Sequence, residues 1–311
     1  MSTDRLPSGA GRSQPYSRPW ALLWVAAGAS LWGTDTLLRR PLTSVLTSSQ
    51  VVLSEHLILI AVLLPSFWRA RPEWRSLRPL QWAAVLGIAW GGSALGTICF
   101  TEAIKIGNPT TAVFLQKSQP FFSALLARAL LRESLGRRFW ICLLLALAGA
   151  YLVSFGDRLG KPPLDAAHFS AALLALSAAA LWGSSTVLGR FVLNSVSFLT
   201  LTGLRIFAAA PFLVILAWWR SALVVTSLSL NARQGISLVL LALIPGLAAL
   251  LIYYRGLGRT RASLAAVAEL SFPATATLLN WVFLGARVSA IQIAGFALLW
   301  GVILNLERRA P

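Results

Sequence analysis

Five ionisable side chains lie within long apolar segments of this 311-residue chain: Glu55, His56, Lys117, Arg205 and Glu269. On a helix that rises about 1.5 Å per residue, each falls in the middle third of its segment. Because an ionised group in a bilayer is costly, such residues are functional candidates by default. Two acids and two bases fit a site for a polar solute or a proton. They also fit buried ion pairs that fix helix register, and the two interpretations can coexist.

His56 is one of only two histidines, and it adjoins Glu55. Histidine titrates near neutral pH and so suits proton coupling, a role that Glu55 or Glu269 could also take. The alternative is a neutral ring bonded to a backbone carbonyl or to a serine. Successive helical residues lie about 100° apart, so we expect at most one of Glu55 and His56 to face straight into a cavity.

Two later segments each carry a polar stripe at helical spacing, which places the stripe on one face. The stripes are Gln116, Gln119, Pro120 and Ser123 in the first, and Ala266, Glu269, Pro273, Thr277 and Asn280 in the second. A polar face in lipid must contact protein or a water-filled path. Pro120 and Pro273 each release the carbonyl four residues earlier, those of Gln116 and Glu269. We predict that both prolines are hinges or ligand-binding breaks, with a packing kink as the alternative.

Tryptophan is abundant, with 13 copies, and most of them mark the edges of apolar segments. Trp32 and Trp182 lie deeper and at corresponding places in the two halves of the chain. A deep indole can line a pocket through its face, or it can simply pack. We assign both to the candidate pocket because of their symmetric placement.

The composition points to lipid as the solvent, with 57% hydrophobic and 12% charged residues, whereas soluble domains average about 45–50% and about 25%. Each apolar segment is long enough to span a bilayer, and spanning segments must be helices to satisfy their backbone. We therefore predict an all-α integral membrane protein with a disordered cytoplasmic tail at 1–19. The ten predicted spans are 20–38, 50–68, 80–105, 109–131, 137–155, 167–189, 197–219, 235–257, 262–284 and 288–306.

The basic residues favour one orientation and exclude one class of partner. Lys and Arg are enriched on the flanks that share a side with the N-terminus, which predicts that both termini are cytoplasmic. The net charge of +17 is spread over the segment ends. Nucleic-acid binding requires a continuous basic patch, so we exclude it.

The second half of the chain repeats motifs of the first. Trp32-Gly33 corresponds to Trp182-Gly183, and the proline stripes at 116–120 and 269–273 correspond in turn. Glu55 then aligns with Arg205. Five spans per repeat is an odd number, so the repeats at 20–155 and 167–306 must be inverted relative to each other. Inverted repeats are typical of alternating-access carriers, whose site lies near the midplane between the copies.

These motifs resemble the drug/metabolite transporter superfamily, of the EamA type. The Trp-Gly pairs, Pro120, Pro273 and Glu133 carry the resemblance, together with the ten-span layout. It implies an inner-membrane carrier, often an exporter of amino acids or other metabolites, with a central cavity between the repeats. One departure is that the second repeat has Ala286 and Arg287 where a counterpart of Glu133 is expected.

We therefore predict a secondary transporter that exports a small organic metabolite, such as an amino acid, across the cytoplasmic membrane by alternating access. It is expected to act as a monomer or homodimer whose partners are the solute and the lipid bilayer. The assigned substrate-binding residues are Trp32, Glu55, His56, Gln116, Lys117, Gln119, Trp182, Arg205 and Glu269.

Two alternatives stay open at this stage. One is a flippase for a lipid-linked intermediate, with Lys117 and Arg205 at a headgroup site. The other is an intramembrane transferase, for which His168 near Asp165 is the only hint. We expect no enzyme activity, cofactor or metal site, because HExxH, GxSxG and complete phosphate-loop motifs are absent from the sequence.

Overall fold

The computed structural model describes residues 20–39, 41–42, 45–106, 112, 115–155, 169–219, 230–284 and 289–308. Within these residues nine helices are long and apolar enough to cross a membrane. They match nine of the ten predicted spans, each within a few residues. The predicted tail at 1–19, and the sites suggested at Asp165, His168, Ala286 and Arg287, lie outside the described residues.

The helices divide into two sets that follow the predicted repeats. The first set is α1 (Ala21–Trp32), α2 (Asp35–Arg39), α3 (Ser48–Arg69), α4 (Arg71–Arg75), α5 (Pro79–Leu86), η1 (Gly87–Leu95), α6 (Gly96–Ile106), α8 (Gln119–Leu130) and α9 (Arg137–Phe155). The second set is α10 (Phe169–Val192), α11 (Phe198–Trp219), α12 (Ala232–Leu241), η3 (Ala242–Ala248), α13 (Ala249–Leu257), α14 (Ala262–Ala268), α15 (Ser271–Leu284) and α16 (Ala290–Arg308).

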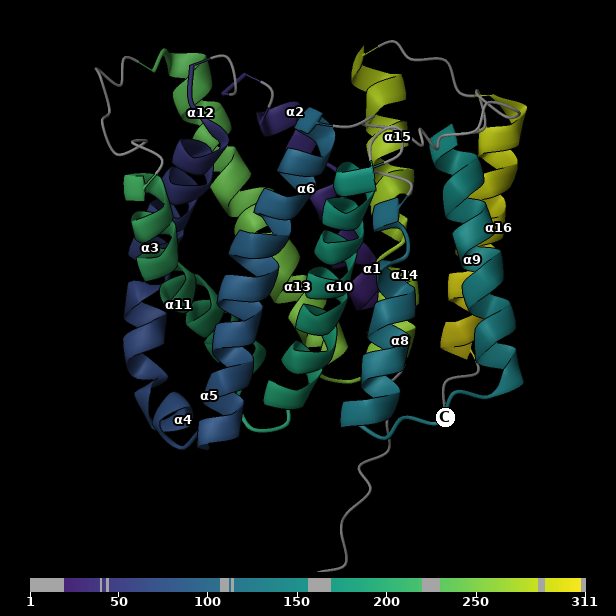
Figure 1. Ribbon diagram of the computed structural model, residues 1–311, viewed down its shortest axis with the longest axis horizontal. Helices are drawn as coiled ribbons and strands as arrows, with labels where there is room; N and C mark the ends of the chain where they lie inside the picture. The colour runs from purple at the N-terminus through teal and green to yellow at the C-terminus, as the bar shows by residue number, and fades with distance from the viewer. Residues whose placement is uncertain are drawn as a thin grey trace, which may run out of the picture.

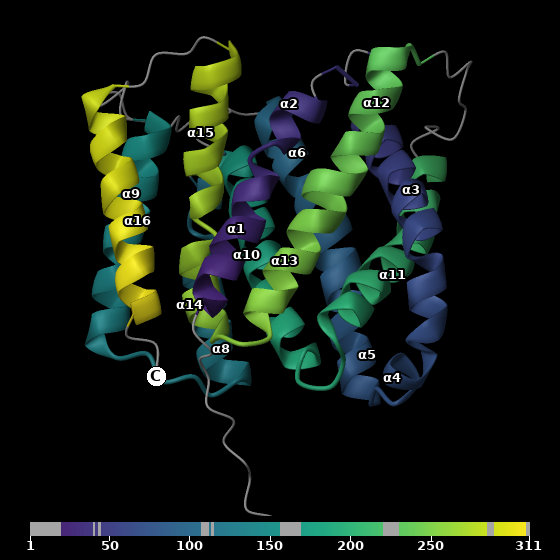
Figure 2. The ribbon, with the colours of Figure 1, turned by 180° about the vertical axis from the view of Figure 1, so that it is seen from behind.

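The two sets interleave in one bundle, in which α5, α8, α9 and α10 lie toward the viewer in Figure 1 and α1, α13, α15 and α16 lie toward the viewer in Figure 2. Helix α1 packs on α13, α14 and α15 of the second set, and its counterpart α10 packs on α6, η1 and α8 of the first. Figures 1 and 2 show α1 and α10 running in opposite directions, as inverted repeats require. Helices α9 and α16 pair at one end of the molecule, as both views show.

Glycines allow the closest of these contacts. A Cβ on Gly92 would lie 1.9 Å from Ser185 Oγ, and one on Gly96 would lie 2.8 Å from Trp182 Nε1. Small residues let helices in a membrane approach to backbone distance. The small-residue spacing in the third span therefore positions α10, and Trp182 with it, against η1 and α6.

The third span of each repeat contains a π-helix at its centre, η1 in one and η3 in the other. A π-helix has wider turns than an α-helix and is frequent at functional sites. Gly92 lies in η1, and Pro245, which cannot donate a backbone hydrogen bond, lies in η3. The sequence analysis did not predict these elements.

The fourth span of each repeat is interrupted. In the first repeat a turn at Lys117 and Ser118 precedes α8, and in the second Glu269 and Leu270 separate α14 from α15. The sequence predicts helical spans over 109–131 and 262–284 with a hinge or kink at each proline, and the described residues show a break before each proline instead.

The two prolines start helices rather than bend them. Pro120 lies in the first turn of α8, where a missing N–H has no cost, and Pro273 is the third residue of α15. The carbonyl of Glu269 accepts the N–H of Phe272 at 3.1 Å, so Pro273 does not release it as predicted. The assignment of Pro120 and Pro273 as hinges stays a prediction.

Candidate functional site

Two adjoining cavities lie between the repeats. The larger, which we call the outer cavity, has a volume of about 680 Å³, and the smaller, the inner cavity, about 240 Å³. Their combined size suits an organic ligand, since ligand pockets measure about 300–1,000 Å³. Trp32, Trp182, Arg205 and Phe272 line both cavities and so form the junction between them.

The two symmetric tryptophans are each held by the third span of the other repeat. Trp182 Nε1 donates to the carbonyl of Gly92 in η1 at 2.9 Å, and its ring centroid lies 5.4 Å from that of Phe100. The Trp32 ring centroid lies 5.0 Å from that of Tyr253 on α13. The structure therefore brings both predicted indoles to one pocket wall.

Glu269 lies at the break between α14 and α15, buried in the wall of the inner cavity. Its carboxylate accepts hydrogen bonds from Tyr253 Oη at 2.7 Å, Thr186 Oγ1 at 2.8 Å and Gln119 Nε2 at 2.5 Å. Gln116 Nε2 extends this chain by donating to Gln119 Oε1 at 3.1 Å. All these donors are neutral, and within the described residues no cationic group lies within 4.0 Å of Glu269.

Arg205 is the cation shared by the two cavities. Its Nε donates to Ser93 Oγ in η1 at 2.8 Å, and its Nη1 donates to Tyr254 Oη at 3.0 Å. Among the residues that the structure describes, no carboxylate lies within 4.0 Å of it. Arg205 and Glu269 therefore present opposite charges to one cavity without neutralising each other.

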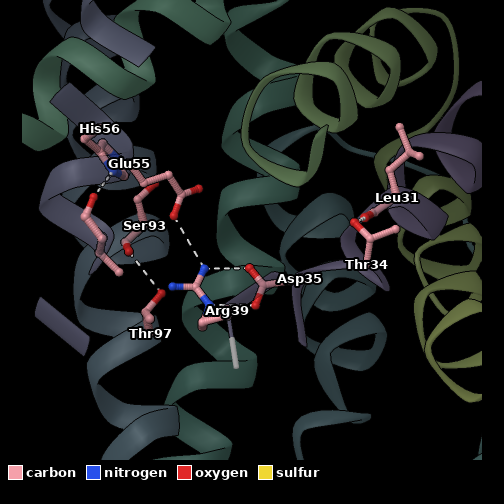
Figure 3. A network of polar contacts seen from close by, with 9 residues as sticks. Leu31, Thr34, Asp35, Arg39, Glu55, His56, Ser93 and Thr97 are labelled. Carbon is pink, nitrogen blue, oxygen red and sulfur yellow. Dashed lines mark hydrogen bonds and ion pairs between the residues drawn. The ribbon is translucent and has the colours of Figure 1, made fainter. Parts of the chain in front are cut away.

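A charged cluster borders the outer cavity, as Figure 3 shows. Arg39 binds both carboxylate oxygens of Asp35, at 2.6 and 2.5 Å, and reaches Glu55 Oε2 at 3.4 Å. The alternative interpretation, in which Glu55, Lys117, Arg205 and Glu269 pair with each other, is therefore wrong for Glu55, whose partner among the described residues is Arg39. The side chains of Asp35 and Arg39 are 33% and 29% exposed to solvent, so the outer cavity reaches the surface at this cluster.

His56 lies beside this cluster, buried against the outer cavity. Its Nδ1 is 2.9 Å from the carbonyl oxygen of Val52, and its Nε2 has no hydrogen-bond partner in the described structure. Both Glu55 and His56 line the outer cavity (Figure 3). That at most one of them faces straight into this cavity stays a prediction.

Lys117 is the predicted site residue that the structure places elsewhere. It is buried at the turn before α8, with Nζ 5.5 Å from the ring centroid of Phe272, and it lines neither cavity. Gln116 and Gln119 do line the inner cavity. Tyr253, Thr186, Ser93 and Phe272 were missed by the sequence analysis, since single aromatic or hydroxyl residues in apolar spans carry no distinctive pattern.

Polar contacts join the repeats on the face that holds Trp20 and Arg308, the described chain ends. Glu133 accepts the backbone N–H groups of Ala262 and Ser263 at 2.7 and 3.1 Å, and so caps α14 of the other repeat. Glu73 on α4 accepts the backbone N–H of Ser197, just before α11, at 2.7 Å and the hydroxyl of Thr200, in the first turn of α11, at 2.8 Å. The helix segments that line the outer cavity lie toward the opposite face (Figure 1). The outer cavity thus lies toward the face away from the chain ends, and contacts between helix termini of the two repeats lie on the face of the chain ends.

Residues 19–155 and 169–306 each match the model of the EamA-like transporter family. The chain belongs to the EamA-like transporter family. The resemblance inferred from the sequence is confirmed, and with it the all-helical membrane fold of two EamA repeats. This is a family of transporters rather than enzymes, which removes the transferase alternative.

Two curated relatives and one solved structure agree with this assignment. The chain is 31% identical to the riboflavin transporter ImpX of Fusobacterium nucleatum over 92% of this chain and 97% of the relative. It is 26% identical to the uncharacterized transporter YwfM of Bacillus subtilis over 89% of this chain and 90% of the relative. The crystal structure of another protein, whose sequence is 22% identical to this chain, superposes on it with a TM-score of 0.74. The superposition covers 94% of this chain and 100% of the other protein's chain, which shows that the two share a fold.

Proposed function

We propose that this EamA-family protein is a secondary transporter that carries a flavin, with riboflavin as the first candidate, across the cytoplasmic membrane by alternating access. The observation that carries the proposal is the pair of adjoining cavities between inverted repeats, with aromatic rings at their junction. Discontinuous helices at the midplane, such as the fourth spans here, are the usual way in which carriers build a solute site. The 31% identity to a riboflavin transporter supports the flavin class.

The polar groups around the junction fit a flat heteroaromatic solute. Trp32, Trp182 and Phe272 offer ring faces and edges for stacking. Arg205 offers N–H donors, Glu269 offers acceptor oxygens, and hydroxyl groups line the outer cavity. A small number of polar groups among aromatic walls is the common composition of an organic-ligand pocket.

The proposal includes the orientation expected from the basic residues, with both chain ends in the cytoplasm. In that orientation the cluster of Asp35, Arg39 and Glu55 faces the outside of the cell, and the structure is the outward-facing state. An alternating-access carrier moves its solute in the direction set by the imposed gradient. Export, the direction implied by the sequence resemblance, is therefore a prediction that depends on the physiological gradient.

A second candidate substrate is an amino acid or another zwitterion. The opposite charges of Arg205 and Glu269 on the inner cavity favour it, because they could bind a carboxylate and an ammonium group together. A lipid-linked flippase has less support, because Lys117, half of its proposed headgroup site, lines neither cavity.

Uptake into proteoliposomes tests the proposal. Purified protein is reconstituted, and labelled riboflavin is compared with a panel of labelled amino acids, with solute loaded outside or inside. Saturable riboflavin flux that falls in the Trp32→Leu variant is expected. The matched control is Trp90→Leu, because Trp90 bonds to the Ala208 carbonyl and lines neither cavity. Flux of amino acids with no riboflavin flux would replace the flavin assignment by the zwitterion.

A further inference from the structure

The outer and inner cavities differ in chemistry, and the difference matches the two ends of a flavin. We propose that the ring system of the substrate lies in the inner cavity and that its hydroxylated side chain lies in the outer cavity, where His56 Nε2 determines specificity for that side chain. This inference rests on the proposed flavin transport and adds the orientation of the substrate and the basis of its selection.

The inner cavity can bind the pyrimidinedione end of the ring. That end presents an N–H group between two carbonyl groups. The carboxylate of Glu269 only accepts hydrogen bonds and the guanidinium of Arg205 only donates them, so the first suits the N–H and the second suits a carbonyl. Trp32, Trp182 and Phe272 at the junction then contact the faces and edges of the ring.

The outer cavity is rich in hydrogen-bond acceptors. Thr97 Oγ1 donates to the Ser93 carbonyl at 3.0 Å and Thr101 Oγ1 donates to the Thr97 carbonyl at 2.8 Å, so each hydroxyl proton is used within its own helix. Their lone pairs remain for a ligand, as do those of Glu55. A polyhydroxylated chain supplies donors that match these acceptors.

His56 is the acceptor that most clearly indicates a ligand. The Val52 carbonyl can only accept, so the His56 Nδ1 that lies 2.9 Å from it carries the proton. In the neutral ring the buried Nε2 is then an acceptor, and it has no partner among the described residues. Buried polar atoms are normally hydrogen-bonded, so a buried orphan atom in a side chain that lines a cavity points to a missing ligand group.

The charges at the mouth predict a further selection. Asp35 and Glu55 place two carboxylates around the single guanidinium of Arg39, and the Asp35 carboxylate already binds that guanidinium at two points. A phosphate at the mouth would approach two carboxylates and one guanidinium that is already bound, since Arg205 lies at the junction with the inner cavity. The outer cavity therefore favours riboflavin over its phosphorylated form.

Competition against labelled riboflavin in proteoliposomes tests the assignment. The competitors are lumiflavin, which has the same ring with a methyl group in place of the side chain, and flavin mononucleotide, which adds a phosphate. In the wild type we expect lumiflavin and flavin mononucleotide each to compete at least tenfold less well than unlabelled riboflavin. In His56→Phe we expect riboflavin affinity to fall about tenfold, the usual effect of one lost hydrogen bond to a buried group, while lumiflavin affinity stays unchanged.

Conservative variants separate binding from folding. His56→Gln keeps an acceptor and should recover part of the preference for riboflavin, and Trp90→Phe should change neither affinity. If His56→Phe gives no folded protein, Thr97→Val and Thr101→Val serve as near-isosteric substitutes with the same expected loss. Glu55→Gln should improve competition by flavin mononucleotide.

The outcomes distinguish the two proposals. If the wild type does not bind riboflavin, the flavin function itself is wrong. If the wild type binds riboflavin but the outer-cavity variants weaken lumiflavin and riboflavin equally, or weaken neither, the flavin function stands and the assigned orientation is overturned.

Discussion

Replacement of Glu269 by glutamine changes the charge of the inner cavity and leaves its shape almost unchanged. Glu269 Oε1 accepts from Tyr253 and Thr186, and an amide oxygen can do the same. The new amide nitrogen would face the donor Nε2 of Gln119, a conflict that a flip of the Gln119 side chain removes. Because Gln116 donates to Gln119, it would flip too, and the rearrangement ends there.

The expected effect on stability is small. Each of the three hydrogen bonds loses about 1 kcal/mol when its acceptor becomes neutral, because bonds to charged groups contribute about 1.5–3 kcal/mol and neutral ones about 0.5–1.5 kcal/mol. Removal of a buried charge recovers a desolvation cost of several kcal/mol, which offsets that loss. The melting temperature of Glu269→Gln in detergent should therefore lie within a few degrees of the wild type or above it.

The expected effect on transport is large by comparison. A substrate N–H that bonds to a carboxylate loses roughly 1–1.5 kcal/mol when the acceptor becomes an amide, which corresponds to about a tenfold higher KM for uptake. The matched control is Glu307→Gln, which makes the same chemical change where the carboxylate accepts the N–H of Leu22, outside both cavities. Wild-type uptake kinetics in folded Glu269→Gln would refute the role of this carboxylate in binding.

Three further predictions concern the parts that hold the site. Glu133→Ala removes the cap of α14 and should lower stability by about 1–2 kcal/mol in a thermal-shift assay. Glu133→Gln keeps an acceptor oxygen and should lose less, and equal losses in the two variants would contradict capping by hydrogen-bond acceptance. Gly92→Val should abolish the monodisperse peak in size-exclusion chromatography, because a Cβ at this position would lie only 1.9 Å from Ser185 Oγ. The control is Gly136→Ala, where the added Cβ would have no atom within 4 Å. Burial opposes ionisation of Glu73, but hydrogen bonds from Ser197 and Thr200 outweigh it and hold its pKa below the ordinary 4.5. The stabilisation of the folded protein by these hydrogen bonds should therefore be complete above pH 4.5 and decline as pH falls through the lowered pKa. A difference in melting temperature between wild type and Glu73→Gln that grows in acid would contradict this.

Much of the fold could be predicted because a bilayer restricts it so strongly. Nine of the ten apolar segments became spanning helices within a few residues of their predicted bounds, and the Trp-Gly pairs at 32 and 182 identified the repeat. The interruptions at Lys117 and Glu269 could not be predicted from the prolines alone. A proline three or four residues after a polar side chain fits a kink within a helix as well as the start of a new one.

The candidate site was predicted by residue type but not by pairing. The alignment of the two repeats matched Glu55 with Arg205 because they occupy equivalent positions in the two copies. Equivalent positions in inverted copies need not be in contact. The actual partner of Glu55 is Arg39 (Figure 3), which lies on α2, a separate short helix after the turn at Gly33 and Thr34. The periodic patterns that identify spans and repeats do not report an ion pair between a short helix and a neighbouring span.

The most direct measurement is the position of the bound solute in a cryo-electron microscopy map of the protein with riboflavin. The account predicts density for the ring at the junction between Trp32 and Trp182, with its polar end toward Glu269 and its side chain toward His56. Density confined to the lipid-facing surface, or cavities still empty at saturating riboflavin, would contradict the claim that a transported flavin binds between the two repeats.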